Sequence, residues 1–321
     1  MTLPEPFAHR LALLTREHRH LIDRPNARHP EWNSGVFDRF LHPVVTAAHA
    51  PLHWRFDLDP ETNPRLIERL GVNATFNSGA IELDGRVFLM VRVEGVDRKS
   101  FFALAESATG VDGFRFRDEP IVMPDAPGSP PDTNVYDMRL TAHEDGHIYG
   151  LFCTERKDTA KPHDLSAAIA QCGIARTRDL RTWERLPDLK TRSAQQRNVV
   201  LHPRFVGGKY ALYTRPQDDF MAVGAGGGIG FCLCDDMSDA AVSDERIIEP
   251  RVYHTVKEYK NGQGPPPLPT PRGWLHLAHG TRPAKRRSTR AGHSPPTATQ
   301  PMSISKCTAL GSVFATSRSS A

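Results

Sequence analysis

The stretch Gly85-Arg-Val-Phe-Leu-Met-Val-Arg92 decides the fold, because three later stretches repeat its pattern of a glycine, an apolar run and a closing arginine. The later stretches run from Gly146 to Arg156, from Gly208 to Arg215 and from Gly273 to Arg282. Successive glycines lie 61, 62 and 65 residues apart. Each run has the composition of a β-strand. The spacing therefore indicates an internal repeat of β-structure.

A tight turn is predicted before each of these strands. The turn sequences are Leu83-Asp84-Gly85, Glu144-Asp145-Gly146, Val206-Gly207-Gly208 and Pro271-Arg272-Gly273. Hairpin turns need positive φ angles, which glycine adopts at little cost. Further polar turns follow three of the hairpins, at Ser107–Phe114, Thr177–Trp183 and Cys234–Ala240, and each leads toward another short strand. We therefore expect about four strands in each unit.

A repeat of more than 60 residues without helical periodicity favours the blades of a β-propeller over the helix pairs of an α-solenoid. We predict an all-β fold with about four propeller blades. The alternative is an irregular β-sandwich whose hairpins resemble one another by chance. Pro- and Gly-rich loops at Met123–Asp132, Gly224–Gly230 and Gly262–Pro271 lie between the strands, where a propeller places its binding site.

Composition excludes several classes of protein. The chain has 321 residues, of which 39% are hydrophobic, and this is enough for a large core. It contains no apolar run of about 18 residues, and the charged N-terminus has no signal-peptide h-region. We expect a cytoplasmic location and no membrane contact. The five cysteines lack zinc-ligand spacing, so we interpret them as reduced and structural.

The sequence divides into three parts. Residues 1–30 have the helical spacing of an N-terminal arm, which we expect to serve homo-oligomer contacts. Residues 31–282 carry the propeller pattern. Residues 283–321 contain six basic and no acidic residues, and we predict a disordered, solvated Ser/Arg/Pro-rich tail. Such a tail could also contact nucleic acid, but we favour no nucleic-acid partner.

The repeat pattern stops after Arg282. A fifth hairpin glycine is expected near position 337, which lies beyond the last residue of the sequence. We therefore hypothesise that the terminus is truncated or frame-shifted and that the last blade is incomplete.

One acid and several cations occupy equivalent places in the repeats. Asp137 lies between Tyr136 and Met138 near a strand start, an environment that can desolvate a carboxyl, as a general acid requires. The cations are Arg92, Arg156, Arg215 and Arg282 at the strand ends, with Arg197, His202, Lys260 and His279 nearby. Any one arginine could instead form a salt bridge between blades. Together they suit an anion, most simply phosphate.

Long motifs in this order resemble glycoside hydrolase family 130. They are Gly71-Val-Asn-Ala-Thr-Phe-Asn-Ser-Gly-Ala80, Asn134-Val-Tyr-Asp-Met-Arg-Leu-Thr141, Gln196-Arg-Asn-Val-Val-Leu-His-Pro203, Tyr213-Thr-Arg-Pro-Gln217, Gly226-Gly-Gly-Ile-Gly230, Tyr253-His-Thr-Val-Lys-Glu-Tyr-Lys-Asn-Gly-Gln-Gly-Pro265 and His279-Gly-Thr-Arg282. The resemblance covers residues 20–282 and is strongest to the branch that phosphorolyses 4-O-β-D-mannosyl-D-glucose. It implies a five-bladed propeller, here incomplete, with a central pocket.

The resemblance also implies the chemistry. The expected reaction is an inverting phosphorolysis of 4-O-β-D-mannopyranosyl-D-glucose to α-D-mannose 1-phosphate and D-glucose, with inorganic phosphate as co-substrate and no metal or organic cofactor. Asp137 matches the proton donor, which in the family acts through the 3-hydroxyl of the mannosyl unit. The matched phosphate-binding positions are Arg197, Arg215, Lys260 and His279, to which we add Arg156; the expected sugar-binding residues are Asn77, Ser78, Arg92 and Tyr136.

Two other functions stay open at this point. A β-mannoside hydrolase on the same fold would need a second carboxylate as base, for which Asp218, Asp219 and Glu258 are candidates. A non-catalytic propeller would only bind sugar. The sequence does not distinguish glucose from N-acetylglucosamine or mannose as the leaving sugar. Because part of the family's sugar site lies in the missing last blade, we expect weak or absent turnover from this chain.

Overall fold

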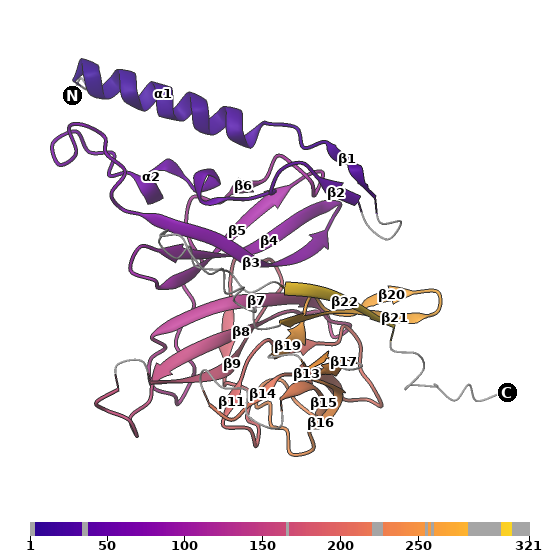
Figure 1. Ribbon diagram of the computed structural model, residues 1–321. Helices are drawn as coiled ribbons and strands as arrows, with labels where there is room; N and C mark the ends of the chain where they lie inside the picture. The colour runs from indigo at the N-terminus through magenta and orange to yellow at the C-terminus, as the bar shows by residue number, and fades with distance from the viewer. Residues whose placement is uncertain are drawn as a thin grey trace, which may run out of the picture.

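The computed structural model describes residues 4–33, 38–164, 167–219, 227–253, 256–257, 260–281 and 303–309. Strands dominate, and the N-terminal part adds helices α1 (Glu5–Ile22) and α2 (Leu52–Arg55) and the 3-10 helix η1 (Ala47–His49). Four sheets, each of four strands, follow one another along the chain. They surround a common region in Figure 1, as blades of a propeller do. The expected all-β propeller architecture with about four blades is confirmed.

The first two blades are regular antiparallel meanders. Blade one comprises β3 (Val72–Leu83), β4 (Arg86–Gly95), β5 (Ser100–Ser107) and β6 (Arg115–Phe116), paired in that order. Blade two comprises β7 (Asn134–Ala142), β8 (Ile148–Lys157), β9 (Ala168–Thr177) and β10 (Glu184–Leu186), again paired in sequence. In each blade the first strand lies toward the centre of the molecule (Figure 1).

The third and fourth blades are less regular. Blade three pairs β12 (Val200–Leu201), β13 (Tyr210–Thr214), β15 (Gly228–Cys234) and β16 (Arg246–Pro250), while β11 (Gln195–Gln196) pairs with β14 (Pro216–Gln217). In blade four, β19 (Lys260–Gln263) and β20 (Leu268–Thr270) pair with β21 (Gly273–Thr281), which also pairs with β22 (Ser303–Ala309). Two short ladders complete the sheets, β1 (Arg28–Asn33) with β2 (Asp38–Phe40) and β17 (Val252–Tyr253) with β18 (Val256–Lys257).

The four hairpin glycines have the backbone conformation that the sequence predicts. Their φ angles are +71° at Gly85, +85° at Gly146, +79° at Gly208 and +122° at Gly273. Gly85, Gly146 and Gly208 stand at the turns before β4, β8 and β13, and Gly273 is the first residue of β21. Because residues with a side chain rarely adopt these angles, the repeated glycine fixes where each hairpin turns.

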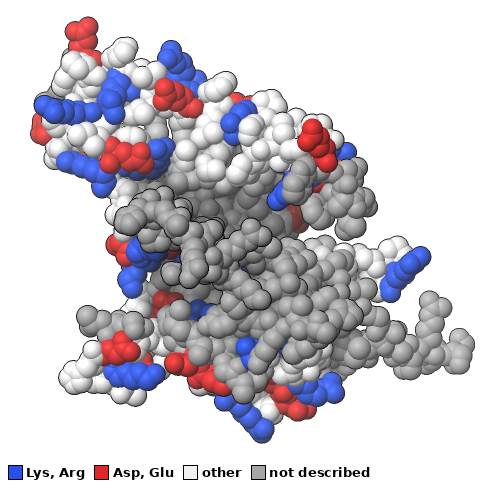
Figure 2. Space-filling view, in the orientation of Figure 1, with Lys and Arg blue, Asp and Glu red and all other residues white. Residues whose placement is uncertain are grey.

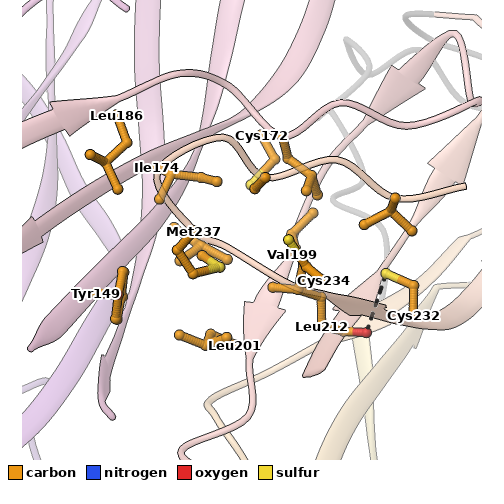
Figure 3. Close-up of a cluster of buried hydrophobic side chains, with 14 residues drawn as sticks. Tyr149, Cys172, Ile174, Leu186, Val199, Leu201, Leu212, Cys232, Cys234 and Met237 are labelled. Atoms are coloured by element: carbon orange, nitrogen blue, oxygen red, sulfur yellow. Dashed lines mark hydrogen bonds between the residues drawn. The ribbon is translucent and has the colours of Figure 1, made fainter. Parts of the chain in front are cut away.

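The core lies between neighbouring blades. One cluster joins blades two and three through buried side chains that include Tyr149, Ile174, Leu201 and Leu212 (Figure 3). A second joins blades one and two through Met90, Phe102, Met138 and Phe152. Burial of this apolar surface stabilises the ring at about 25 cal/mol per Å². Blade-to-blade packing therefore sets the position of the strands that carry the site.

The cysteines contribute to this core. Cys153, Cys172, Cys232 and Cys234 are buried and form no disulfide. The Sγ atom of Cys232 lies 3.8 Å from the carbonyl oxygen of Leu212 (Figure 3). Their expected role as reduced core residues is confirmed for these four; the side chain of Cys307 lies outside the described residues.

The two ends of the chain differ in how they pack. Helix α1 lies beyond blade one and buries Phe7 against Phe56 and Leu66 (Figure 1). Acidic and basic side chains are interspersed over this part of the surface (Figure 2). In the stretch expected to be a disordered tail, Ser303–Ala309 forms β22 antiparallel to β21. That expectation is corrected for these seven residues, because the free edge of β21 offers backbone partners that no side-chain pattern reveals.

No helix in the described ranges is long and apolar enough to cross a bilayer.

Candidate active site

A cavity of about 390 Å³ opens where all four blades meet. Its lining is mainly polar and comprises Asn77, Tyr136, Asp137, Arg139, Arg197, Asn198, Arg215, Lys260 and His279. Seven of the ten predicted site residues are among these. The remaining three, Ser78, Arg92 and Arg156, do not line the cavity.

Three repeats shape the cavity in the same way. Asn77, Asp137 and Asn198 have φ angles of 49°, 58° and 51°, in the left-handed region. Asn77 and Asp137 each sit at a break in strand register, between Phe76 and Gly79 and between Tyr136 and Arg139. An extra residue at such a bulge bends the strand and redirects its side chain. Asn and Asp tolerate this conformation better than other non-glycine residues. The repeat thus brings polar groups to one centre.

Asp137 is the one carboxylate among the described residues that line the cavity. Its side chain is 13% exposed. The Nδ2 atom of Asn77 donates to its Oδ1 at 3.1 Å, and Nη1 of Arg92 donates to the same oxygen at 3.1 Å. These two donors hold Oδ1 in place. A fixed carboxyl group in a shielded pocket is the arrangement a general acid needs.

Arg92 lies behind Asp137, where it cannot line the pocket. Its guanidinium carbon lies 4.3 Å from the centre of the Phe76 ring and 4.6 Å from that of Tyr136. The sequence predicts Arg92 as a sugar ligand, whereas in the structure Arg92 contacts Asp137 and does not line the cavity. It holds Asp137, because stacking and hydrogen bonds already occupy the guanidinium.

Arg139, Arg197, Arg215 and Lys260 line the cavity, and burial makes the charges of Arg215 and Lys260 costly. Burial lowers the pKa of the Arg215 guanidinium, and the nearby charge of Arg197 lowers it further. Burial also lowers the pKa of Lys260, with additional repulsion from Arg215 and Arg197. The Nε of Arg215 is buried and makes no hydrogen bond to the described residues. Cations that repel one another in a shielded cavity create a strong preference for an anion.

His279 is neutral at physiological pH. Burial is the main reason that its pKa falls to about 4, and the charges of Arg215 and Arg139 lower it as well. A neutral imidazole keeps one N–H donor and one acceptor. His279 can therefore bind a phosphate oxygen without adding to the positive charge.

Tyr136 is held by Glu155, a half-buried carboxylate. Its hydroxyl donates to Oε1 of Glu155 at 2.6 Å, and Nδ2 of Asn134 lies 3.4 Å from Oε2. Burial raises the pKa of the Tyr136 phenol. Tyr136 therefore stays protonated, and its side chain lines the cavity.

Arg156 is the predicted phosphate ligand that the structure does not bring to the cavity. Its Nη2 lies 2.6 Å from Asp132 Oδ1, its Nη1 2.5 Å from Asp188 Oδ2, and its Nε donates to the carbonyl of Pro130. Arg185 pairs with the same two aspartates. Arg156 thus connects the loop before β7 to blade two. It pairs with carboxylates in loops, and the repeat pattern of the sequence does not include these loops.

Arg139 and Asn198 line the cavity but were not singled out by the sequence. Nη1 of Arg139 donates to the carbonyl of Asn77 at 3.2 Å, and its Nε donates to that of Gly264 at 3.1 Å. A signal for Asn198 was present: Asn77, Asp137 and Asn198 lie 60 and 61 residues apart, close to the spacing of the hairpin glycines. Arg139 offers no such periodic signal.

Two of the three candidate bases of a hydrolase, Asp218 and Asp219, lie outside the lining of the cavity. Asp219 lies 3.7 Å from Lys161 with 56% of its side chain exposed. Glu258 and the predicted strand-end cation Arg282 lie outside the described residues. His202, also near the cations in the sequence, is buried against Trp274, with ring centroids 4.4 Å apart.

Solved structures share this architecture. A β-1,2-mannobiose phosphorylase from Listeria innocua, solved with β-1,2-mannobiose, has a TM-score of 0.56 at 17% identity, with 80% of this chain and 75% of the other covered. A glycosyl hydrolase from Bacteroides ovatus has a TM-score of 0.56 at 18% identity, over 82% and 71% of the two chains. Similarity at this level of identity establishes the fold.

Sequence comparison is more specific. A 4-O-β-D-mannosyl-D-glucose phosphorylase of Bacteroides fragilis is 61% identical over 277 residues, which are 86% of this chain and 70% of the relative. The model of a family described as β-1,4-mannooligosaccharide phosphorylase matches residues 55–291. That range includes every residue that lines the cavity. The chain belongs to glycoside hydrolase family 130.

Proposed function

We propose that this protein is a glycoside phosphorylase that converts 4-O-β-D-mannosyl-D-glucose and phosphate into α-D-mannose 1-phosphate and D-glucose. The observation that carries the proposal is the cavity itself, where one carboxyl group faces four cations whose mutual repulsion favours an anion. The 61% identity to a mannosylglucose phosphorylase supports the choice of substrate.

The reaction balances as a single displacement. A phosphate oxygen attacks C1 of the mannosyl unit, and the bond from C1 to the glycosidic oxygen breaks. Protonated Asp137 supplies the proton that the departing O4 of glucose takes up, and the 3-hydroxyl of the mannosyl unit relays it. Attack from the face opposite the leaving group inverts the anomeric centre, so the β-mannoside yields the α-phosphate.

Phosphate removes the need for a second carboxylate. An inverting hydrolase uses a base to activate water, whereas phosphate is already a nucleophile. It needs charge compensation and alignment, which we assign to Arg197, Arg215 and Lys260, with His279 as a neutral partner. We assign Asn77 and Tyr136 to sugar binding, and we place Arg139 between the sugar site and the phosphate site. The proposed reaction uses no metal or organic cofactor.

The cellular setting is part of the proposal. A small disaccharide and phosphate are the expected partners, in the cytoplasm, with neither nucleic acid nor membrane involved. Self-association remains proposed, although the apolar face of α1 already packs on its own chain through Phe7.

Product analysis tests the function. The protein is incubated with mannosyl-glucose, with and without phosphate, at high enzyme concentration, and glucose, mannose and mannose 1-phosphate are quantified. Glucose and the phosphate ester should form in equal amounts and only when phosphate is present. Free mannose without phosphate would favour the hydrolase, and sugar binding that is unaffected by Asp137→Asn, without any product, would favour the non-catalytic propeller.

A further inference from the structure

Glu94 is a buried carboxylate that the proposed reaction does not use. It lies near the end of β4, is 7% exposed and does not line the cavity. Its Oε1 accepts a hydrogen bond from Nδ2 of Asn73 at 2.8 Å, and its Oε2 accepts one from Nη2 of Arg92 at 3.2 Å. Nε of Arg98 lies 3.5 Å from Oε1. A buried charge is costly unless it is paired, so its place beside Arg92 has to be maintained by the fold.

Arg92 connects Glu94 to the site. The rings of Phe76 and Tyr136 confine its guanidinium to one plane, and its side chain is only 14% exposed. Within that plane its direction is set by three acceptors: Nε bonds to Ser100 Oγ at 2.9 Å, Nη2 to Glu94 and Nη1 to Asp137. Removing any one acceptor lets the planar group turn.

We propose that Glu94 is a positioning residue that acts through Arg92 to hold the carboxyl group of Asp137. Asn73 anchors Glu94 to β3, Glu94 orients the guanidinium, and the guanidinium fixes Oδ1 of Asp137. The catalytic consequence rests on the proposed function. The geometric part, in which Glu94 fixes the contact between Arg92 and Asp137, does not depend on it.

A merely structural salt bridge is the competing explanation, and the chain contains a matched control. Arg86 and Glu106 in the same sheet form an ion pair with the same 3.2 Å separation, but at the surface, where the Glu106 side chain is 34% exposed. Glu106→Gln removes a pair of equal length whose two residues do not line the cavity. Any effect of Glu94→Gln that is absent in Glu106→Gln reflects the site.

Kinetics provides the first readout. In Glu94→Gln we expect kcat for mannose 1-phosphate formation to fall about 10- to 100-fold, since small misplacement of a catalytic group is that costly. The KM for phosphate should change less than about two-fold, because the cations that bind it are untouched. Glu106→Gln should match the wild type. In an Arg92→Lys background, Glu94→Gln should have little further effect, because the two residues act in series.

A crystal structure of Glu94→Gln provides the second readout. We expect Nη1 of Arg92 to move out of hydrogen-bond range of Asp137. If the wild type forms no mannose 1-phosphate, the proposed function fails while this structure still decides the geometric claim. Should Glu94→Gln not fold, Asn73→Ala removes the hydrogen bond that anchors Glu94, at an exposed position, and this variant should also have a lower kcat. A retained Arg92–Asp137 contact, or unchanged kcat in a folded variant, would overturn the proposal.

Discussion

Asp137 owes its position to its backbone conformation as much as to its side chain. Its φ of 58° places it at a bulge that turns the side chain to the centre of the molecule, where Asn77 and Arg92 hold Oδ1. Asparagine adopts the same backbone region and has almost the same shape. The chemistry at this residue can therefore be removed while the structure is kept.

Asp137→Asn should abolish most of the activity without loss of folding. The amide cannot supply a proton, so we expect kcat to fall about 100- to 10,000-fold, the usual contribution of a general acid. Initial-rate measurements of mannose 1-phosphate check this, with the melting temperature as control. Asp218→Asn, at an exposed position outside the cavity, should leave the rate unchanged. A rate near that of the wild type in Asp137→Asn would remove Asp137 from the mechanism.

Arg215 directly follows strand β13, and Arg156 lies near the end of the equivalent strand β8. We expect substitution of Arg215 to impair the reaction with phosphate and substitution of Arg156 to impair stability. Arg215→Met removes a cation from the cavity, and we expect kcat/KM for phosphate to fall about 10- to 100-fold, as the loss of a charged hydrogen bond implies. Arg156→Met should leave the KM for phosphate unchanged. It should lower the free energy of unfolding by about 3 kcal/mol, because Asp132 and Asp188 lose a buried partner.

Phosphate titrations and urea unfolding of both variants measure the two effects. An increase in the phosphate KM in Arg156→Met would restore the interpretation that the sequence alone suggests.

The innermost strands set the distances in the site. Gly79 follows the bulge of β3, and an added Cβ would lie 2.5 Å from the carbonyl oxygen of Met138 on β7. Backbone atoms cannot yield as a flexible side chain can, so β3 and β7 depend on this glycine to approach. The hydrogen bond between Asn77 and Asp137 spans these two strands.

Gly79→Ala should therefore damage the site and the fold together. We expect a loss of about 1–3 kcal/mol in the free energy of unfolding, typical of overpacking, and a lower kcat. Gly85→Asn is the control, since nothing lies within 4 Å of an added Cβ there and asparagine tolerates its φ of +71°. Unfolding curves and initial rates measure both effects. Equal stability of Gly79→Ala and the wild type would show that the strands have room to separate.

Strand β21 makes stability depend on pH. Burial is the main cause that lowers the pKa of His276 and His279 to about 4, from an ordinary value of 6.5. Between these values the unfolded chain binds more protons than the folded one. The free energy of unfolding therefore has its full value above pH 6.5 and decreases as the pH drops toward 4. At pH 5 the decrease is on the order of 1–2 kcal/mol per histidine.

Urea unfolding at pH 7 and pH 5 measures this difference, and His276→Gln should reduce it. A difference that stays the same in His276→Gln would exclude this histidine as a source of the pH dependence.

Across the whole molecule, the repeated hairpins predict more of the fold than of the site. Gly85, Gly146, Gly208 and Gly273 mark the blades because a tight turn constrains local sequence strongly. Asp137, Arg197 and Arg215 could be foreseen as one cluster, since equivalent repeat positions meet at the axis. Arg156 could not, because its partners Asp132 and Asp188 lie in loops without periodicity. Strand β22 could not either, because its pairing depends on the exposed edge of β21.

The central claim is that four blades gather one acid and several cations so that phosphate, rather than water, attacks the sugar. The most direct test is to follow the reaction of mannosyl-glucose with phosphate by phosphorus and proton NMR. The account predicts α-mannose 1-phosphate and glucose in equal amounts, with glucose release dependent on phosphate. Release of free mannose at the same rate in the presence and absence of phosphate would contradict it.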